Sequence, residues 1–268
     1  MAIESVAQAE SNEDLVTRSQ VSWETTTAEV GTNRLVGPLN LVMHTICSAA
    51  ARRILSVVAA LLILKVTGSV LLNYRDYIPP NFDSGFLRGR EAYFAGSYHW
   101  VFYAHIVSGP LALILGLVLL SEYVRQWFPR WHRVLGRLQV LGVLLFVAPS
   151  GLWMAFHAEA GPIAACGFAT LAIATAICTA MGWRSAVKRR FAEHRRWMWR
   201  SFLLLSSAVV LRMLGGLATV TGVGALWIDQ VTPWASWLVP IVVFDLCDGG
   251  NRLRNRAFIR SVRASAEQ

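Results

Sequence analysis

The chain has 268 residues, of which 55% are hydrophobic and 15% charged, and its mean hydropathy is +0.46. Soluble domains carry roughly a quarter charged residues, so this composition excludes an ordinary water-soluble protein. The formal net charge is +9, but the cations gather beside apolar stretches rather than on a polar domain. We therefore predict no nucleic-acid partner.

The N-terminal segment is polar. Residues 1–33 hold six of the sixteen acidic residues and lack the basic stretch followed by an apolar stretch that marks a signal peptide. A short apolar stretch with a Gly-Pro break follows at 35–50, of a kind that lies along a membrane surface. We interpret residues 1–46 as a disordered or interfacial cytoplasmic tail.

Six apolar segments follow, most of them near the roughly twenty residues that a helix needs to cross the hydrocarbon core. They occupy residues 54–72, 99–123, 138–157, 162–183, 202–221 and 233–246. Strands of membrane barrels alternate apolar and polar residues, and these segments do not. The sequence predicts an all-α, polytopic integral membrane protein. We expect a bundle of about six transmembrane helices over residues 47–250, followed by a basic cytoplasmic tail at 251–268.

Lysine and arginine are concentrated in alternate connections. Most of them lie between the second and third spans, between the fourth and fifth, and after the sixth. Cytoplasmic loops carry such an excess, so we expect both termini in the cytoplasm. The expected location is the bacterial inner membrane, with the lipid bilayer as partner. Nothing in the sequence specifies an oligomeric state.

The longest outer connection is residues 73–98, which contains Pro79-Pro80 and several glycines. These residues mark turns. The segment is open to two interpretations: it covers a site on the outer face, or it is a plain connector.

Histidine stands just before two of the apolar segments, in "RWHRVLGR" at 130–137 and "EHRRWMWR" at 193–200. The third and fifth spans run in the same direction, so His132 and His194 are predicted at one depth near the cytoplasmic interface. Two imidazoles at one depth on two helices are what the iron of a b-type haem requires as axial ligands. This pair predicts an inner haem site.

A second pair is predicted nearer the outer face. His105 lies about six residues, or roughly 9 Å, into the second span, and His157 ends the third span. The two would ligate the iron of an outer haem if the second span tilts, although His99 matches the depth of His157 more closely.

Glycine and arginine accompany these histidines. Gly109 follows His105 and Gly136 follows His132 by four residues, a spacing that places each pair on one helix face. The missing side chains leave room for a flat macrocycle or for a close helix. Arg133 and Arg195 either extend to lipid phosphates, which we favour, or neutralise haem propionates or an anionic substrate.

Two charges lie deeper in the predicted spans. Arg212 stands about ten residues into the fifth span, and Asp245 about twelve residues into the sixth. Charges inside a bilayer are costly and are usually paired or functional. We predict an Arg212–Asp245 ion pair, which serves either as a clamp between the last two helices or in a polar cavity.

The sequence carries a resemblance to a known family. "HIVSG" at 105–109, "WHRVLGR" at 131–137, "EHRRWMWRS" at 193–201 and "LR" at 211–212 resemble the bacterial membrane family of domain of unknown function 2306, over residues 55–250. That family has no assigned activity, so the resemblance implies a membrane fold and no reaction.

The layout of the histidines is similar to that of the two-haem transmembrane cytochromes b. This resemblance implies one haem near each membrane face. The cytochromes draw their outer pair from the second and fourth spans, whereas the fourth span here, 162–183, contains no histidine.

Two functional hypotheses remain, beside a third in which the chain is a structural subunit whose histidines only lie at the water interface. The first is a membrane electron-transfer protein or oxidoreductase that binds haem b, with quinone or a small reductant as electron source. The alternative is a non-redox membrane protein for small-solute transport or lipid-headgroup binding, in which the cations bind phosphate and the deep charges line a cavity. Whether the chain is an enzyme is left open.

Overall fold

The computed structural model describes residues 49–83, 85–222 and 226–266. The chain divides into two compact units, Met1–Ser56 and Val57–Gln268. The start of helix α2 (Ala49–Leu72) belongs to the first unit, and the other described elements belong to the second. The predicted tail at 1–46 lies outside the described residues. Across the described ranges the elements are helical and no strand occurs, so the predicted all-α class is confirmed.

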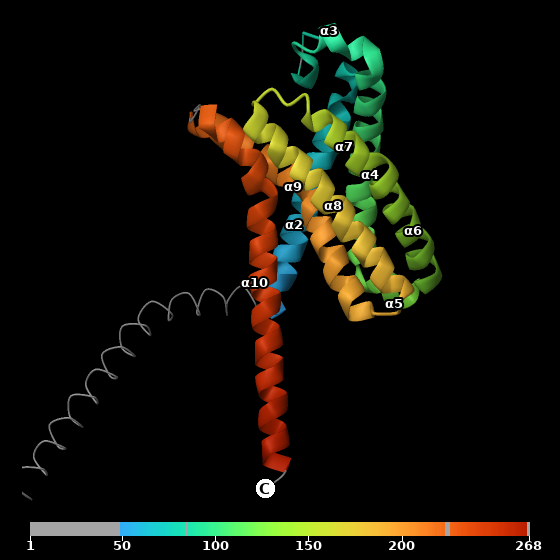
Figure 1. The fold of residues 1–268 in the computed structure, drawn as a ribbon, viewed down its shortest axis with the longest axis vertical. Helices are drawn as coiled ribbons and strands as arrows, with labels where there is room; N and C mark the ends of the chain where they lie inside the picture. The colour runs from blue at the N-terminus through green and yellow to red at the C-terminus, as the bar shows by residue number, and fades with distance from the viewer. Residues whose placement is uncertain (1–48, 84, 223–225, 267–268) are drawn as a thin grey trace, which may run out of the picture. The chain divides into compact units, whose positions relative to one another are not determined.

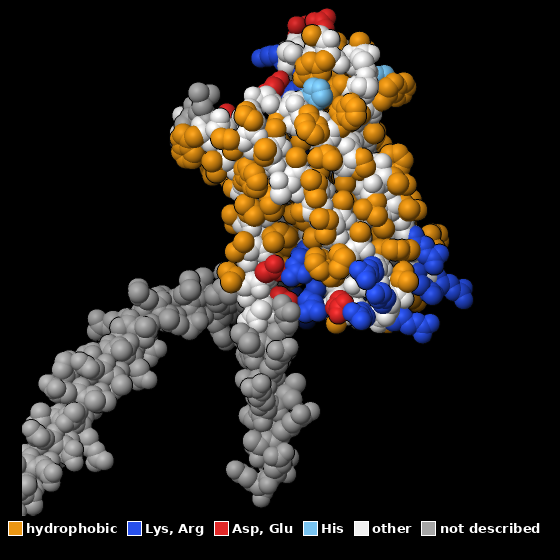
Figure 2. All heavy atoms as spheres, viewed as in Figure 1, with side chains coloured by type: hydrophobic (Ala, Val, Ile, Leu, Met, Phe, Trp, Pro, Cys, Tyr) orange, Lys and Arg blue, Asp and Glu red, His pale blue; other side chains and the backbone are white. Residues whose placement is uncertain are grey.

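Six segments of the described chain are long and apolar enough to cross a membrane, which confirms a multi-pass integral membrane protein (Figure 1). They contain α2, α4 (His99–Leu120), α6 to α7 (Pro129–Ala155), α8 (Pro162–Val187), α9 (Phe191–Thr221) and most of α10 (Leu226–Ala266). Large apolar side chains cover the visible face along most of its length (Figure 2). That surface is the one expected where lipid is the solvent.

Three helices begin earlier than the apolar segments that predicted them. α6 begins at Pro129, α9 at Phe191 and α10 at Leu226, whereas the apolar segments begin at 138, 202 and 233. Apolar composition marks the stretch that lies in hydrocarbon, but the backbone hydrogen bonds of a helix continue through the polar interface. His132 and His194, which precede the apolar segments, therefore lie inside the first turns of α6 and α9.

Proline shapes the second span. Pro110 lies inside α4 and has no N–H, so the carbonyl of Ile106 loses its partner within the helix. The hydroxyl of Tyr74, just beyond the end of α2, donates to that carbonyl. The contact joins the end of the first span to the middle of the second and satisfies a backbone group that lipid cannot.

The third span contains a π-helical turn. α6 (Pro129–Gly142) continues through η4 (Val143–Val147) into α7 (Ala148–Ala155). Pro149 follows the turn directly, and the Ser150 hydroxyl donates to the carbonyl of Phe146. A wide turn of this kind accommodates the missing N–H of a proline without breaking the span.

The connection at 73–98 is a folded cap on one end of the bundle, which we call the capped end. It contains η1 (Asn73–Asp76), η2 (Gly85–Leu87), α3 (Glu91–Tyr93) and η3 (Phe94–Tyr98). Its buried core joins α4 through Leu87, Phe94, Tyr98 and Phe102. Arg90 is buried, forms an ion pair of 3.2 Å with Glu159 and lies over the Phe86 ring. This packing favours a covering structure over a plain connector.

Small residues let α8 and α9 pack closely. The Thr179 and Ser201 hydroxyls hydrogen-bond across this interface at 2.7 Å and are almost fully buried. Gly182 of α8 faces Met198 and Trp197 of α9. Interhelical contacts in lipid rely on such small side chains and short polar bridges, because no hydrophobic effect drives helices together there.

Replacing Gly167 with alanine is expected to destabilise the bundle. The added Cβ would lie 2.9 Å from Nε1 of Trp234, and this ring is fixed because Nε1 donates to the carbonyl of Ile163. Overpacking of this kind costs about 1–3 kcal/mol. A lower thermal midpoint of the detergent-purified variant would show it.

Gly142→Ala is the matched control, since a Cβ at this helical glycine meets nothing within 4 Å. Its thermal midpoint should equal or exceed that of the wild type, because alanine favours a helix. Equal midpoints for the two variants would contradict the packing seen at Gly167.

Candidate functional site

Cations gather at the end of the bundle opposite the cap, which we call the basic end (Figure 2). It is formed by α5 (Glu122–Trp127), the first turns of α6 and α9, and the last turn of α8. These elements and the connection between α8 and α9 carry the following cations: Arg125, Arg130, Arg133, Arg184, Lys188, Arg189, Arg190, Arg195 and Arg196. The basic end therefore presents a strongly positive surface.

His132 and His194 occupy equivalent positions at this end. Each is the fourth residue of its helix, counted from Pro129 in α6 and from Phe191 in α9. Each closes the first turn by donating its backbone N–H over 2.9 Å, to Phe128 in one case and Arg190 in the other. His194 and Arg125 both lie close enough to His132 to act on its ring electrostatically. The structure thus brings the two predicted inner histidines into one region.

The ring of His194 has a defined orientation. Its Nδ1 lies 2.8 Å from the carbonyl oxygen of Gly182 in α8. A carbonyl only accepts, so Nδ1 carries the proton and donates it. In the neutral ring Nε2 then holds a free lone pair, the arrangement found in most metal-ligating histidines.

The ring of His132 is only partly buried, but its Nδ1 is fully shielded and has no hydrogen-bond partner within the described part of the chain. Beside it, a Cβ added to Gly136 would meet nothing within 4 Å. The predicted glycine therefore does leave open space next to His132 on α6.

The two flanking arginines are both exposed. Nε of Arg133 donates to the carbonyl of Pro129 one turn back, and Arg195 donates to Glu122 of α5 over 3.2 Å. Glu122 also accepts from Arg125 at the same distance. Exposed ion pairs add little stability, so these contacts leave the guanidinium groups available to other anions.

The predicted outer pair has no common site. His105 is held in the bundle, with Nδ1 2.9 Å from the Ser150 hydroxyl and Gly151 packed against its ring. His157 instead lies among the rings of Tyr93 and Tyr98, with centroids 5.1 and 4.8 Å away. His157 lies seven residues after Ser150, beyond the end of α7. The described structure therefore gives the two histidines different neighbours.

The predicted Arg212–Asp245 ion pair is wrong. Asp245 is bound by Arg200, whose Nε and Nη2 lie 3.0 and 2.7 Å from one carboxylate oxygen. Arg212 is twelve residues further along α9, or about 18 Å. The error arose from the helix start: α10 begins at Leu226 rather than at 233, so Asp245 lies near the basic end and not at mid-depth.

A family model described as predicted membrane protein (DUF2306) matches residues 102–247. The chain belongs to this family. The match extends from α4 into α10 and includes all four predicted histidine ligands, whereas α2 and the cap residues 73–98 lie outside it. No curated protein and no solved structure matches the chain. Membership of DUF2306 thus confirms the resemblance noted in the sequence and adds no reaction.

Several polar residues in this DUF2306 chain were not anticipated. Arg200 was counted with the basic loop, although its pairing with Asp245 lies within the bundle. Gln139 is buried at mid-span and donates to the carbonyl of Ala112 over 3.0 Å. A lone glutamine inside an apolar run was the only sequence signal for it, because polar side chains in lipid need a partner.

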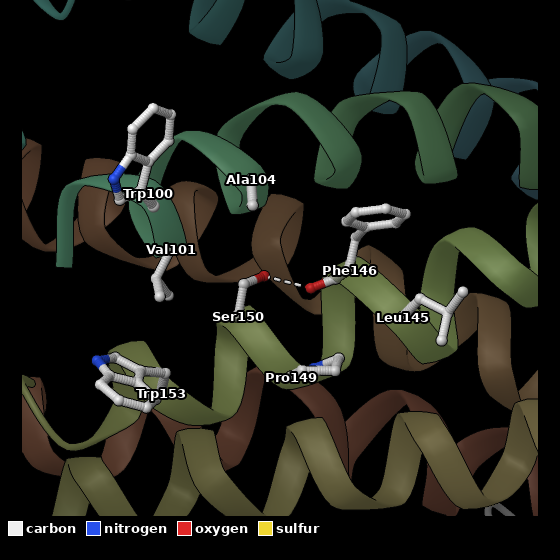
Figure 3. A pocket seen from close by; sticks show the side chains of 8 residues that line it. All are labelled: Trp100, Val101, Ala104, Leu145, Phe146, Pro149, Ser150 and Trp153. Carbon is white, nitrogen blue, oxygen red and sulfur yellow. Dashed lines mark hydrogen bonds between the residues drawn. The ribbon is translucent and has the colours of Figure 1, made fainter. Parts of the chain in front are cut away.

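A shallow groove of about 290 Å³ lies between α4 and the η4–α7 part of the third span (Figure 3). Its lining residues are Trp100, Val101, Ala104, Leu145, Phe146, Pro149, Ser150 and Trp153. The one hydroxyl, on Ser150, is already used by Phe146 and His105. Among the described residues no group of three or more His, Cys, Asp or Glu side chains is placed to hold a metal ion. The groove therefore offers an apolar surface rather than reactive groups.

The corrected ion pair can be tested by a double-mutant cycle. We expect Arg200→Gln and Asp245→Asn to show a coupling free energy of about 0.5–1 kcal/mol, since the two side chains are 21% and 42% exposed. Arg212→Gln with Asp245→Asn should show no coupling. The free energies of unfolding in mixed micelles give both coupling energies. A larger coupling energy for Arg212 with Asp245 than for Arg200 with Asp245 would support the pairing predicted from the sequence.

Proposed function

We propose that the chain is a membrane electron-transfer protein or oxidoreductase in which His132 and His194 would hold one b-type haem at the basic end. The observation that carries the proposal is the equivalent placement of these two histidines in the first turns of α6 and α9. When bound, haem exchanges single electrons through its iron.

The ring nitrogens support this assignment. The hydrogen bond from Nδ1 of His194 to Gly182 directs Nε2 away from α8, and such a bond fixes the tautomer of a ligating histidine. The shielded Nδ1 of His132 lacks a partner among the described residues. The open space at Gly136 provides room beside this ring.

The exposed arginines have a role in the same proposal. Arg133 and Arg195 stand directly after the two histidines, and haem propionates are the anions that such guanidinium groups hold in place. Both side chains of the Arg195–Glu122 ion pair are exposed. A haem propionate can therefore replace Glu122 as the partner of Arg195 at little cost in free energy.

We restrict the proposal to this pair. His105 is committed to Ser150 and His157 to an aromatic cluster, so a second haem between them would require both rings to leave their present neighbours. The excess of cations at the basic end supports a cytoplasmic orientation for it in a bacterial inner membrane. A quinol or a small reductant is the proposed electron source.

A second candidate is a non-redox protein that binds lipid phosphates at the basic end. The observation that favours it is the number of exposed cations there with free N–H groups, such as those of Arg133. Cations at the end of a span commonly contact headgroups, and this function needs no cofactor.

Visible spectra of the purified protein test the first proposal. Expressed in a haem-competent host, the wild type should show a Soret band that shifts on dithionite reduction, with α and β bands and about one haem per chain. His132→Ala and His194→Ala should each abolish the spectrum while the protein remains folded, because each removes an axial ligand.

His99→Ala is the control, since His99 lies at the capped end among Phe94, Trp100 and Tyr103 and should leave the spectrum intact. A colourless, folded wild type would exclude the haem proposal. Lipid binding that persists in His132→Gln but fails in Arg133→Gln would then favour the second candidate.

A further inference from the structure

A layer of polar side chains crosses the bundle in the half nearer the cap. Its depth follows from a core cluster in which Ile63 of α2, Ala112 of α4 and Val209 of α9 pack together. One turn toward the capped end from each of these residues lie Thr67, Ser108 and Arg212. α2 and α9 run toward the cap and α4 runs away from it, so the three side chains share one depth.

The two hydroxyls of this layer lack partners. Thr67 is 4% exposed, and its Oγ1 makes no hydrogen bond to any described residue. The shielded Oγ of Ser108 is likewise without a partner in the described ranges. A buried hydroxyl left unpaired costs about 1–3 kcal/mol, so a ligand that accepts hydrogen bonds from both would remove this cost.

Arg212 supplies a positive charge to the same layer. Its Nη1 donates to the carbonyl of Ala208 in its own helix over 3.2 Å, and none of the described acidic residues forms an ion pair with it. The groups it interacts with through space are Tyr74, Tyr77 and His105, which bring no negative charge. An unpaired guanidinium within a membrane-spanning helix is costly, and an anion would remove that cost.

Glycines beside two of these side chains leave open space. A Cβ on Gly109, next to Ser108, would meet nothing within 4 Å, and the same is true of Gly215 and Gly216, one turn beyond Arg212. The side chain of Arg212 is itself exposed. A group that approaches along the lipid-facing side from the capped end therefore reaches the guanidinium first.

We propose that Arg212, Thr67 and Ser108 form a phosphate-binding site in the cap-side half of the bundle, for a lipid headgroup or for inorganic phosphate. A guanidinium offers five N–H donors in a fork that matches two phosphate oxygens. Two hydroxyls donate to the remaining oxygens. The site shares no residue with the histidine pair at the basic end. The proposal of phosphate binding is therefore independent of the haem proposal.

Binding to the delipidated, full-length protein in dodecyl maltoside tests the site. The two probes are dihexanoyl phosphatidylglycerol and inorganic phosphate, each titrated by calorimetry. Arg212→Gln should weaken binding of at least one probe by about tenfold or more, since a hydrogen bond to a charged group is worth that much in affinity. Arg75→Gln is the matched control, because Arg75 also lies toward the capped end and donates to a nearby backbone carbonyl, that of Leu72 at the end of α2.

Thr67→Val separates a built site from an arginine that merely extends to the interface. It keeps the shape of the side chain and removes the hydroxyl. Without probe, its thermal midpoint should equal or exceed that of the wild type, because an unpaired hydroxyl is lost. Its affinity for the probe should fall about threefold to tenfold.

The results decide between these cases. Arg212-dependent binding of phosphatidylglycerol alone supports a lipid headgroup as ligand, and competition by inorganic phosphate supports the free anion. Equal binding to wild type, Arg212→Gln and Arg75→Gln overturns the proposal. If Arg212→Gln does not fold, unchanged affinity in the double variant Thr67→Val, Ser108→Ala overturns it.

Discussion

Every backbone N–H and C=O within the bilayer must find its partner inside the protein, and the rest of the structure follows from this constraint. It explains why all described spans are helices. It also explains how the second and third spans accommodate a proline. At Pro110 the freed carbonyl of Ile106 takes the hydroxyl of Tyr74, and before Pro149 the third span widens into a π-helical turn with Ser150 as an extra donor. Each of these arrangements also fixes a neighbouring part of the fold. The hydrogen bond from Tyr74 ties the cap to the second span, and the π-helical turn places Ser150 against His105.

The same constraint applies to side chains. Gln139, Thr179 and Ser201 each have a partner across a helix interface, and Asp245 is held by Arg200. Charges and amides that are paired in this way hold helices together without marking a ligand. Thr67 and Ser108, by contrast, have hydroxyls without a partner among the described residues, and Arg212 bonds to a carbonyl of its own helix.

The two ends of the bundle differ in chemistry. The capped end is closed by aromatic packing, with Arg90 tied to Glu159 and covered by Phe86. The basic end is open and cationic, and the helix starts that carry His132 and His194 lie there. A cofactor bound between these starts would be close to one membrane surface, while the phosphate site proposed at Arg212 belongs to the other half. The two proposals can therefore coexist and be tested separately.

The sequence by itself determined the class of this protein, because runs of apolar residues in lipid admit only helices. It also located the two histidine-containing motifs and the family that carries them. It misjudged where three helices begin, since apolar composition reports the hydrocarbon boundary and not the end of backbone hydrogen bonding. For that reason Asp245 was assigned to Arg212 instead of Arg200.

Only the tertiary structure decided which side chains meet, as it separated His105 from His157 and aligned Thr67, Ser108 and Arg212. Such pairings depend on the depth and rotation of each helix, which are set by packing between spans and leave no mark in any single segment.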